Sequence, residues 1–341
     1  MKKRSLNLAE RRSVEENYGL KTINSFPFGG GMRSNTVFIE TNHGPRVAKI
    51  YPQNYSPKVA EFQAEVCNYL HSNGTPTPRI HRNLSGNLVT SEEDRNYVLM
   101  DFLRGAYPSR ADEGVMELTF GTLANVLKTL SGFDTSGGVF EIPEIEIPLG
   151  DQLRVLEERV ESGDHVIGSD FLKYLERIRE IYEQYERDHG EADFPRQLVL
   201  GDFNLESLLV YDGRVSGILD FDQVRFYGKG FDFMHSFDNL CIDKETPGLE
   251  LEERVDWEKL REAMSFYARK DRDIASQFPF FPLMHQDLGL RSLITTFNEV
   301  LSGDLPPEYL YKMGEVYMRR VEIPTRLGQR IIEVLGESLE D

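Results

Sequence analysis

The chain has little of several features, and each shortage excludes a class of protein. Its 341 residues include two cysteines, Cys67 and Cys241, which stand far apart without metal-ligand spacing, so we expect neither a disulfide framework nor a zinc site. No apolar run approaches the roughly 18 residues of a membrane span. The basic segment 1–12 lacks the following apolar stretch of a secretory signal, so the expected location is cytoplasmic, with no membrane partner.

Basic residues are also few. Lys and Arg number 39 against 57 Asp and Glu, which gives a formal net charge of −18. A protein that neutralises nucleic-acid phosphates needs a basic face, so no nucleic-acid partner is expected, although a nucleotide can still bind at a local site. The length exceeds what one hydrophobic core usually supports, and it predicts a globular protein with two lobes.

The most informative stretch is a predicted hairpin rich in carboxylates. Asp212-Gly213 stands between two apolar runs, and Asp-Gly in that setting predicts a two-residue hairpin turn. Pairing backwards from this turn puts Ser207 opposite Ile218.

Acidic side chains gather at the open end of this hairpin. Asp220 follows Ile218, the residue opposite Ser207, by two positions. At roughly 3.3 Å per residue, Asp220 is therefore expected about 7 Å from Ser207. Asp202 lies one loop earlier. Asp222 is a further candidate for the cluster. Carboxylate and hydroxyl oxygens suit Mg²⁺, which keeps substrate phosphates as its other ligands, so the cluster predicts a phosphoryl-transfer site. An ordinary hairpin with acidic turn residues is the alternative.

Residues 200–207, Leu-Gly-Asp-Phe-Asn-Leu-Glu-Ser, and 218–222, Ile-Leu-Asp-Phe-Asp, carry a family resemblance. They resemble the His-Gly-Asp-x-x-x-x-Asn and Asp-Phe-Asp motifs of the aminoglycoside phosphotransferase and choline kinase-like superfamily. The resemblance implies an α+β, bilobal, protein-kinase-like fold. Residues 1–102 would form a small nucleotide-binding lobe of antiparallel sheet with a helix, and residues 103–341 a larger, mainly helical, catalytic and substrate-binding lobe.

Two positions depart from the motif. Its histidine is Leu200 here, and its asparagine, which helps to hold metal in the family, is Ser207. Leucine can fill a buried position but cannot make the hydrogen bonds of histidine. Serine still offers an oxygen ligand, and methylthioribose kinases of the same superfamily are similar in having serine there.

Three upstream segments fit a nucleotide site in the order that kinases require. Gly29, Gly30 and Gly31 would let backbone amides approach phosphates, although a plain flexible hairpin has the same sequence. Lys49 lies in an apolar strand and needs an anionic partner, unless it reaches solvent. In kinases such a lysine grips phosphates and is held by a helical glutamate, for which Glu65 in the helical segment 59–72 is the first choice, with Glu61 one turn earlier.

Residues 97–105 form a strand ending at a glycine, which is similar to the hinge of these kinases. By that resemblance Met100 would lie behind the adenine, Asp101 would offer its carbonyl and Leu103 its amide. Downstream, Asp232 matches an aspartate that braces the catalytic loop from a helix start in the family. His235 and His285 are expected to be satisfied core or surface residues.

The function implied is an ATP-dependent kinase that phosphorylates a hydroxyl of a small molecule. Asp202 would receive or orient the hydroxyl proton, and Asp220 with Ser207 would hold Mg²⁺. Residues 104–196 carry 20 acidic and 10 basic residues, a net of −10, which favours an amine-bearing acceptor, although acidic helix faces that serve solubility are the alternative.

Two other functions stay open. The departures Leu200 and Ser207 suggest a nucleotide-binding pseudokinase with a sensing or scaffold role. A protein kinase is disfavoured because no Ala-Pro-Glu segment follows Asp220.

Overall fold

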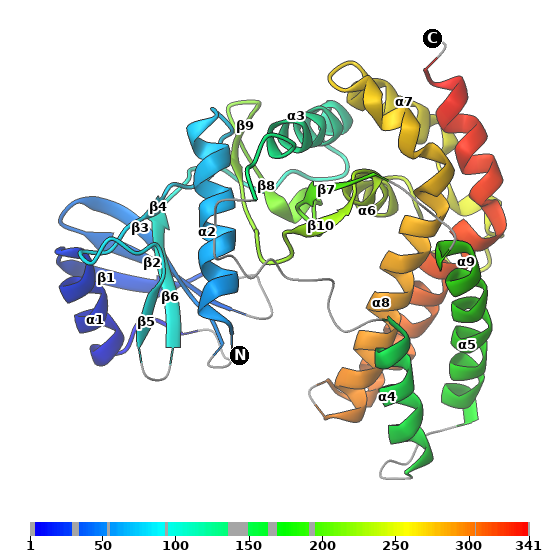
Figure 1. Cartoon of the computed structure of the whole chain (residues 1–341), viewed down its shortest axis with the longest axis horizontal. Helices are drawn as coiled ribbons and strands as arrows, with labels where there is room; N and C mark the ends of the chain where they lie inside the picture. The colour runs from blue at the N-terminus through cyan, green and yellow to red at the C-terminus, as the bar shows by residue number, and fades with distance from the viewer. Residues whose placement is uncertain are drawn as a thin grey trace. The chain divides into compact units, whose positions relative to one another are not determined.

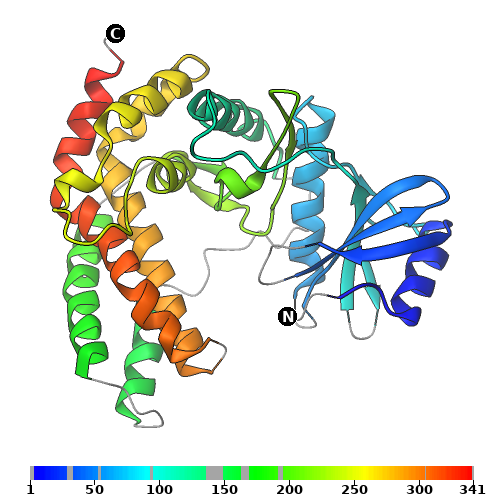
Figure 2. The same cartoon turned by 180° about the vertical axis from the view of Figure 1, so that it is seen from behind.

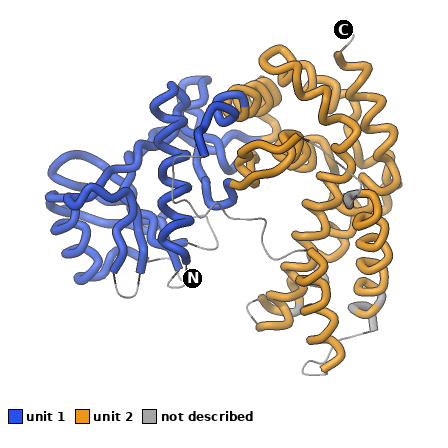
Figure 3. The backbone as a smooth tube through the Cα atoms, in the orientation of Figure 1, with its two compact units in different colours: residues 1–109, 128–143, 205–224 blue, residues 110–127, 144–204, 225–341 orange. Residues whose placement is uncertain are grey.

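The computed structural model describes residues 4–28, 34–52, 55–92, 95–135, 149–162, 169–190, 195–303 and 305–339. These residues form two compact units, coloured separately in Figure 3. Unit 1 comprises residues 1–109, 128–143 and 205–224, and unit 2 comprises residues 110–127, 144–204 and 225–341. Both units are therefore discontinuous in sequence, whereas the predicted lobes 1–102 and 103–341 are continuous; that division stays a prediction.

Unit 1 contains a six-stranded antiparallel sheet in its described residues, with the order β1-β2-β3-β6-β4 and β5 paired to β6. In both Figure 1 and Figure 2 this sheet lies between helices α1 and α2. A separate hairpin, β8 with β9, belongs to the same unit. The elements are α1 (Leu8–Tyr18), β1 (Thr22–Pro27), β2 (Asn35–Thr41), β3 (Gly44–Ile50), α2 (Pro57–Ser72), β4 (Ile80–His81), β5 (Thr90–Glu92), β6 (Arg95–Asp101), the short 3₁₀ turn η2 (Leu205–Ser207), β8 (Leu208–Tyr211) and β9 (Arg214–Ile218).

Alternating burial explains the sheet. In β2, Val37 and Ile39 are fully buried while their neighbours are partly or fully exposed, which is the period of two that a strand requires. These residues pack with Val14 of α1 and with Ala48 of β3 in one hydrophobic cluster. The sheet is thus held by apolar burial on the face that α1 covers.

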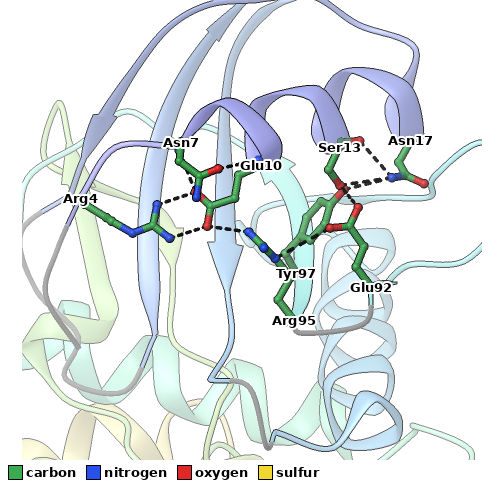
Figure 4. A network of polar contacts seen from close by, with 8 residues as sticks. All are labelled: Arg4, Asn7, Glu10, Ser13, Asn17, Glu92, Arg95 and Tyr97. Carbon is green, nitrogen blue, oxygen red and sulfur yellow. Dashed lines mark hydrogen bonds and ion pairs between the residues drawn. The ribbon is translucent and has the colours of Figure 1, made fainter.

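Helix α1 is also fastened by a polar network (Figure 4). Asn7 and Glu10 form a reciprocal capping box, which satisfies two backbone donors at the start of the helix. The Glu10 carboxylate is 3% exposed and pairs with Arg4 at 2.5 Å and with Arg95 at 3.0 Å. Because a buried carboxylate needs such partners, this network fixes α1 on the sheet.

Unit 2 is mainly helical. Its described strands β7 (Arg196–Val199) and β10 (Arg225–Gly228) pair antiparallel, with Val199 opposite Arg225. Its helical elements are the π-helical turn η1 (Glu117–Gly121), α3 (Thr122–Leu130, whose last three residues fall in unit 1), α4 (Leu149–Glu161), α5 (Ser169–Gly190), α6 (Gly230–Leu240), η3 (Glu252–Arg254), α7 (Trp257–Ala268), η4 (Arg272–Phe280), α8 (Phe281–Leu301) and α9 (Pro307–Glu337).

Close helix contacts explain the core of unit 2. Helices α4, α5, α8 and α9 share one cluster of buried aliphatic and aromatic side chains. Gly289 in α8 lies against Val321 in α9, where a Cβ atom would come within 2.7 Å of a methyl group, so only glycine allows this approach. Gly230 likewise starts α6 against the ring of Phe281.

Helix α9 contains a proline, Pro324, in its interior. The helix continues through this proline as one element to Glu337. Proline removes a backbone donor, and the hydroxyl of Thr325 donates to the carbonyl of Val321 at 2.7 Å in the same turn. None of the described helices is long and apolar enough to cross a membrane.

Candidate active site

Lys49 and two aspartates form the electrostatic centre of unit 1. The side chain of Lys49, on β3, is 13% exposed, and its Nζ lies 2.5 Å from Asp222 Oδ1 and 3.8 Å from Asp220 Oδ1. Burial lowers the pKa of Lys49, but Asp222 and Asp220 raise it more, so its pKa is above the ordinary value. Lys49 is therefore a charged, half-buried cation beside the carboxylates at the end of the β8–β9 hairpin.

The hairpin register differs from the prediction by one residue. Tyr211 pairs with Arg214 as an Asp-Gly turn requires, but Leu208, rather than Ser207, lies opposite Ile218. The cause is a bulge at Ser216, since Val210 pairs with Val215 and Leu209 with Gly217.

Hydrogen bonds hold this bulge in place. The Ser216 hydroxyl donates to the carbonyl of Arg104 at 2.7 Å, so the extra residue is tied to the chain that follows β6. As a result, the Leu219 N–H donates to the Ser207 carbonyl at 2.8 Å. Ser207 is therefore opposite the residue before Asp220, nearer to that carboxylate in sequence register than predicted.

Asp220 has an unusual backbone conformation and a partly exposed side chain. Its φ of 63° lies in the left-handed region, which aspartate tolerates better than most residues. The side chain is 47% exposed, so it remains available to a ligand while it faces Lys49.

Gln63 is a residue that the sequence prediction missed. Its Nε2 donates to the backbone carbonyl of Asp222 at 2.9 Å, and its amide also meets the Tyr55 hydroxyl at 2.7 Å. Gln63 is buried on α2, so this helix holds the loop that carries both aspartates. The sequence signal was its position on the apolar face of the predicted helix, where a polar residue needs a partner.

The predicted pairing of Lys49 with Glu65 is wrong in this structure. Glu65 pairs with Arg82 at 2.8 Å, and Glu61 accepts the backbone N–H groups of Leu88 and Val89. Residues two apart on a helix lie about 200° apart, so a helix that turns Gln63 to the Asp222 loop turns both glutamates away. A role of Glu65 in nucleotide binding stays a prediction, although the expected pair with Lys49 is not formed.

The predicted hinge residues lie at the end of β6. Met100 pairs with Val47 and Ile80, and the Asp101 carboxylate accepts from His81 Nε2 at 2.8 Å. The side chain of Leu103 lies against Gly217. Their contacts with adenine stay predictions.

An aromatic group beside the hinge was not foreseen. Phe102 stacks on Phe28 with ring centroids 6.3 Å apart, and it meets Phe38 edge to face at 5.3 Å. Phe28 immediately precedes the predicted phosphate-binding glycines, Gly29, Gly30 and Gly31, which lie outside the described residues.

In unit 2, α6 braces the loop that follows β7. Asp232 accepts the N–H groups of Leu200 at 2.6 Å and of Gly201 at 2.7 Å, as predicted. Its side chain is fully buried, and burial raises its pKa to about 6 against the lowering effect of these hydrogen bonds and of Arg225.

Asp202 follows directly in this loop. Its carboxylate is 40% exposed and accepts a hydrogen bond from Asn204 Nδ2 at 2.9 Å. His235 Nδ1 lies 3.4 Å from Asp202 Oδ1, so the prediction that His235 is an ordinary core or surface residue missed this contact. The available signal was the spacing, since His235 follows Asp232 by three positions, about one helical turn. His285 is a core residue of unit 2, as expected, but only its Nε2 has a partner, Asp238 at 3.2 Å; its buried Nδ1 has none among the described residues.

Comparison with known protein families decides the class of this chain. The sequence profile of the phosphotransferase enzyme family matches residues 26–267, which span both units. The chain belongs to this family. Comparison with the sequences of curated proteins gives no match.

Solved structures show that this chain has the bilobal, protein-kinase-like fold that was predicted. An amicoumacin kinase, solved with AMP-PNP, Ca²⁺ and amicoumacin, is 15% identical with a TM-score of 0.68 over 92% of each chain. A microcompartment-associated aminopropanol kinase is 16% identical with a TM-score of 0.67, over 95% of this chain and 98% of its own. Choline kinase from Cryptosporidium parvum is 14% identical with a TM-score of 0.57 over 93% of each chain.

The predicted metal ligands, Asp220 and Ser207, offer oxygen atoms of the kind that a magnesium ion takes when it arrives with a nucleotide. Among the described residues there is no group of three or more His, Cys, Asp or Glu side chains suited to a metal. Mg²⁺ bound through one or two protein oxygens, with waters and phosphates as the remaining ligands, needs no such group. Asp220 supplies an exposed carboxylate, and the carbonyl of the buried Ser207 accepts the N–H of Leu219, the residue before Asp220; the binding of Mg²⁺ by these two side chains stays a prediction.

Proposed function

We propose that the protein transfers the γ-phosphoryl group of ATP to a hydroxyl group of a small molecule that carries an amine. The observation that carries the proposal is the contact of a charged Lys49 with Asp222 and Asp220 in a chain of the phosphotransferase family. Kinases place such a lysine on the nucleotide phosphates and such an aspartate on magnesium. AMP-PNP in the similar amicoumacin kinase supports ATP as donor.

Each residue then has a defined task. Lys49 binds phosphates, glycines 29–31 cover them, and residues 100, 101 and 103 hold the adenine. Asp220 and Ser207 would hold Mg²⁺, which supplies positive charge to the phosphate oxygens when bound. Asp202 orients the acceptor hydroxyl and takes its proton while the acceptor oxygen bonds to the γ-phosphorus and the bond to the β–γ bridging oxygen breaks, so that ADP leaves. We also propose that residues 1–102 and 103–341 are the nucleotide and acceptor lobes.

An amine on the acceptor has two supports. The similar structures include kinases of aminopropanol and of choline, both of which are nitrogen-bearing alcohols. The sequence span 104–196 carries a net charge of −10. Some of these acidic residues form surface ion pairs along α4 and α5, such as Glu158 with Arg154 at 2.9 Å and Glu157 with Arg179 at 2.7 Å. The net negative charge of the span therefore acts on a ligand at long range.

A pseudokinase with a sensing or scaffold role is the second candidate, because Leu200 and Ser207 replace two family residues. Incubation of the protein with Mg-ATP and a metabolite mixture, followed by mass spectrometry, separates the two. We expect a nitrogen-bearing alcohol that gains one phosphate in proportion to the ADP formed. ATP binding without any phosphorylated product would favour the pseudokinase.

A further inference from the structure

Helix α6 holds the loop around Asp202 at several points. Asp232 accepts the N–H groups of Leu200 and Gly201, and the Ser236 hydroxyl donates to the Phe203 carbonyl at 2.9 Å. The helix therefore fixes the backbone on both sides of residue 202. These bonds hold the backbone of the loop, whereas the orientation of the Asp202 carboxylate depends on contacts of its side chain, among them those with Asn204 and His235.

His235 lies on α6 between the two residues that hold the loop. Its side chain is 9% exposed, and its Nδ1 lies 3.4 Å from Oδ1 of Asp202. Within the described part of the chain this buried nitrogen has no hydrogen-bond partner. The separation exceeds a normal N–H···O distance, and a buried donor without an acceptor is costly. Catalytic hydrogen bonds are often long without substrate and shorten in the complex.

Two nearby residues, Asn204 and Leu200, differ from His235 as restraints on Asp202. Asn204 donates to the same oxygen at 2.9 Å, but it belongs to the loop itself and moves with it. Leu200, which stands where the family motif has histidine, is buried and carries no polar group. His235 is anchored in a helix whose side chains at 232 and 236 already hold the loop, so it can act as a fixed reference for the carboxylate.

The charge state of His235 suits a hydrogen-bond donor. Burial lowers its pKa to about 3, with Arg320 and Lys244 adding to that lowering and Asp238 opposing it. The imidazole is therefore neutral near neutral pH, with one nitrogen protonated. A neutral ring can donate a hydrogen bond from Nδ1 without adding a competing base or a new charge at the site.

We propose that His235 is a positioning residue for Asp202. Its Nδ1–H donates to Oδ1 and leaves the second carboxylate oxygen directed at the acceptor hydroxyl. This inference rests on the proposed function, in which Asp202 receives the proton of the acceptor. It assigns to α6 both the backbone and the side-chain geometry of the catalytic loop.

Three variants test the contact through steady-state kinetics. In His235→Asn the amide can place an N–H near the Nδ1 position, whereas His235→Leu keeps a side chain of similar size without any donor. His285→Gln is the control, because His285 is also a buried histidine of unit 2 but contacts Asp238. We expect His235→Leu to lower kcat about 10-fold or more, a part of the 10²- to 10⁴-fold contribution of general acid–base catalysis, with the KM for ATP within about twofold. His235→Asn should restore most of kcat, and His285→Gln should lower thermal stability without lowering kcat.

A spectroscopic arm keeps the inference testable if His235→Leu fails to fold. The ¹⁵N resonances of the His235 imidazole, identified by their loss in His235→Asn, should report a neutral ring protonated at Nδ1, and they should shift in Asp202→Asn. If the His235 resonances shift in Asp202→Asn but the wild-type protein phosphorylates no acceptor, the proposed function is refuted while the contact of His235 with Asp202 is supported. Wild-type turnover in His235→Leu, equal losses in His235→Leu and His235→Asn, or a proton on Nε2 would overturn the role of His235 itself.

Discussion

At the residue scale, the task proposed for Asp202 differs from the tasks proposed for the residues of the nucleotide and the metal. Asp202 contacts Asn204 and His235, and Lys49 contacts Asp220 and Asp222. Asp202→Asn keeps the size of the side chain and removes its basicity. We expect kcat to fall on the order of 10²-fold or more while the Kd for ATP stays near the wild-type value, because the lost group acts on the acceptor. Single-turnover kinetics and calorimetry measure the two; wild-type turnover would refute the assignment.

A second residue-scale prediction concerns Asp220. Asp220→Asn tolerates the positive φ of 63° and removes the charge. Asp212→Asn is a matched control, since Asp212 has φ 53° in the turn of the same hairpin. We expect Asp220→Asn to lose about 10-fold or more of the Mg²⁺-dependent part of ATP affinity, by analogy with losses at metal sites, and Asp212→Asn to lose none. Titration of each variant with ATP, with and without Mg²⁺, decides; an unchanged Mg²⁺ effect in Asp220→Asn would place the metal elsewhere.

Residue identities were the most predictable part of the site, and their partners the least. The motifs singled out Lys49, Asp202, Ser207 and Asp220, whose roles stay predictions, and they predicted the bracing contacts of Asp232, which the structure shows. They could not predict the bulge at Ser216, because that bulge depends on a hydrogen bond to Arg104, 112 positions away. A two-residue turn predicts the pairing of residues farther along a hairpin only where neither strand contains a bulge.

At the element scale, α2 is the helix whose rotation the sequence did not predict. Two glutamates at helical spacing made Glu65 the expected partner of Lys49, but the rotation that buries Phe62 and Val66 turns Gln63 toward the loop that carries Asp222. Apolar burial stabilises such a helix by several kcal/mol, whereas one ion pair contributes less, so packing decides which face meets the site.

The rotation of α2 leads to a third prediction. Gln63→Leu removes one hydrogen bond to the Asp222 loop, and we expect the KM for ATP to rise about 3- to 10-fold, which corresponds to about 1 kcal/mol. Glu65→Gln weakens only the pair with Arg82, whose side chain is 53% exposed, so kcat and KM should stay within about twofold. Steady-state kinetics of both variants decides between the two side chains. A larger effect in Glu65→Gln would restore the glutamate as the partner of the nucleotide site.

Helix α6 gives a fourth prediction, on pH. Burial raises the pKa of Asp232 to about 6 in the folded protein from 3.8 in an exposed carboxyl. The folded state therefore binds this proton more tightly than the unfolded state, so the stability contributed by Asp232 falls as pH rises from about 4 to about 6 and is constant above. In Asp232→Asn the titration is absent.

The direction of the pKa shift of Asp232 can be tested by comparing the unfolding free energies of the wild type and Asp232→Asn at two pH values. We expect the loss of unfolding free energy in Asp232→Asn to be larger at about pH 4.5 than at about pH 7, by about 2 kcal/mol, since one pKa unit corresponds to about 1.4 kcal/mol. Urea unfolding at both pH values measures it, and the subtraction removes the titration of the other acids. A loss that grows toward pH 7 would mean that the fold stabilises the charged carboxylate and lowers the pKa of Asp232, which contradicts the prediction.

At the scale of the whole molecule, the order of the motifs predicted the fold, because a glycine loop, a strand lysine, a hinge and two acidic loops follow one another in few other architectures. Length predicted two lobes, but both compact units are discontinuous in sequence, and residues 205–224, whose strands form a separate hairpin, belong to the same unit as the N-terminal sheet. Such a discontinuity leaves no mark in composition, because it arises from contacts such as that of the Ile218 N–H with the Pro76 carbonyl at 2.8 Å.

Net charge is the property of the whole molecule that bears on the acceptor. A charge of −18 raises the local concentration of cations near the surface, and this attraction is screened as the Debye length falls from about 30 Å at 0.01 M to about 8 Å at 0.15 M ionic strength. The paired acids of α4 and α5 contribute to this field without forming a binding site.

We therefore expect the KM for an amino-alcohol acceptor to rise severalfold between about 0.01 M and about 0.15 M salt, while the KM of an uncharged alcohol changes little. Competition between amino alcohols, aminoglycosides and amino acids on one side and sugar acids on the other measures the preference at both salt concentrations. Preference for a sugar acid would refute the amine-bearing acceptor, and a salt-independent KM for an amine would show that its recognition depends on contacts close to the site, where charge at a distance plays no part.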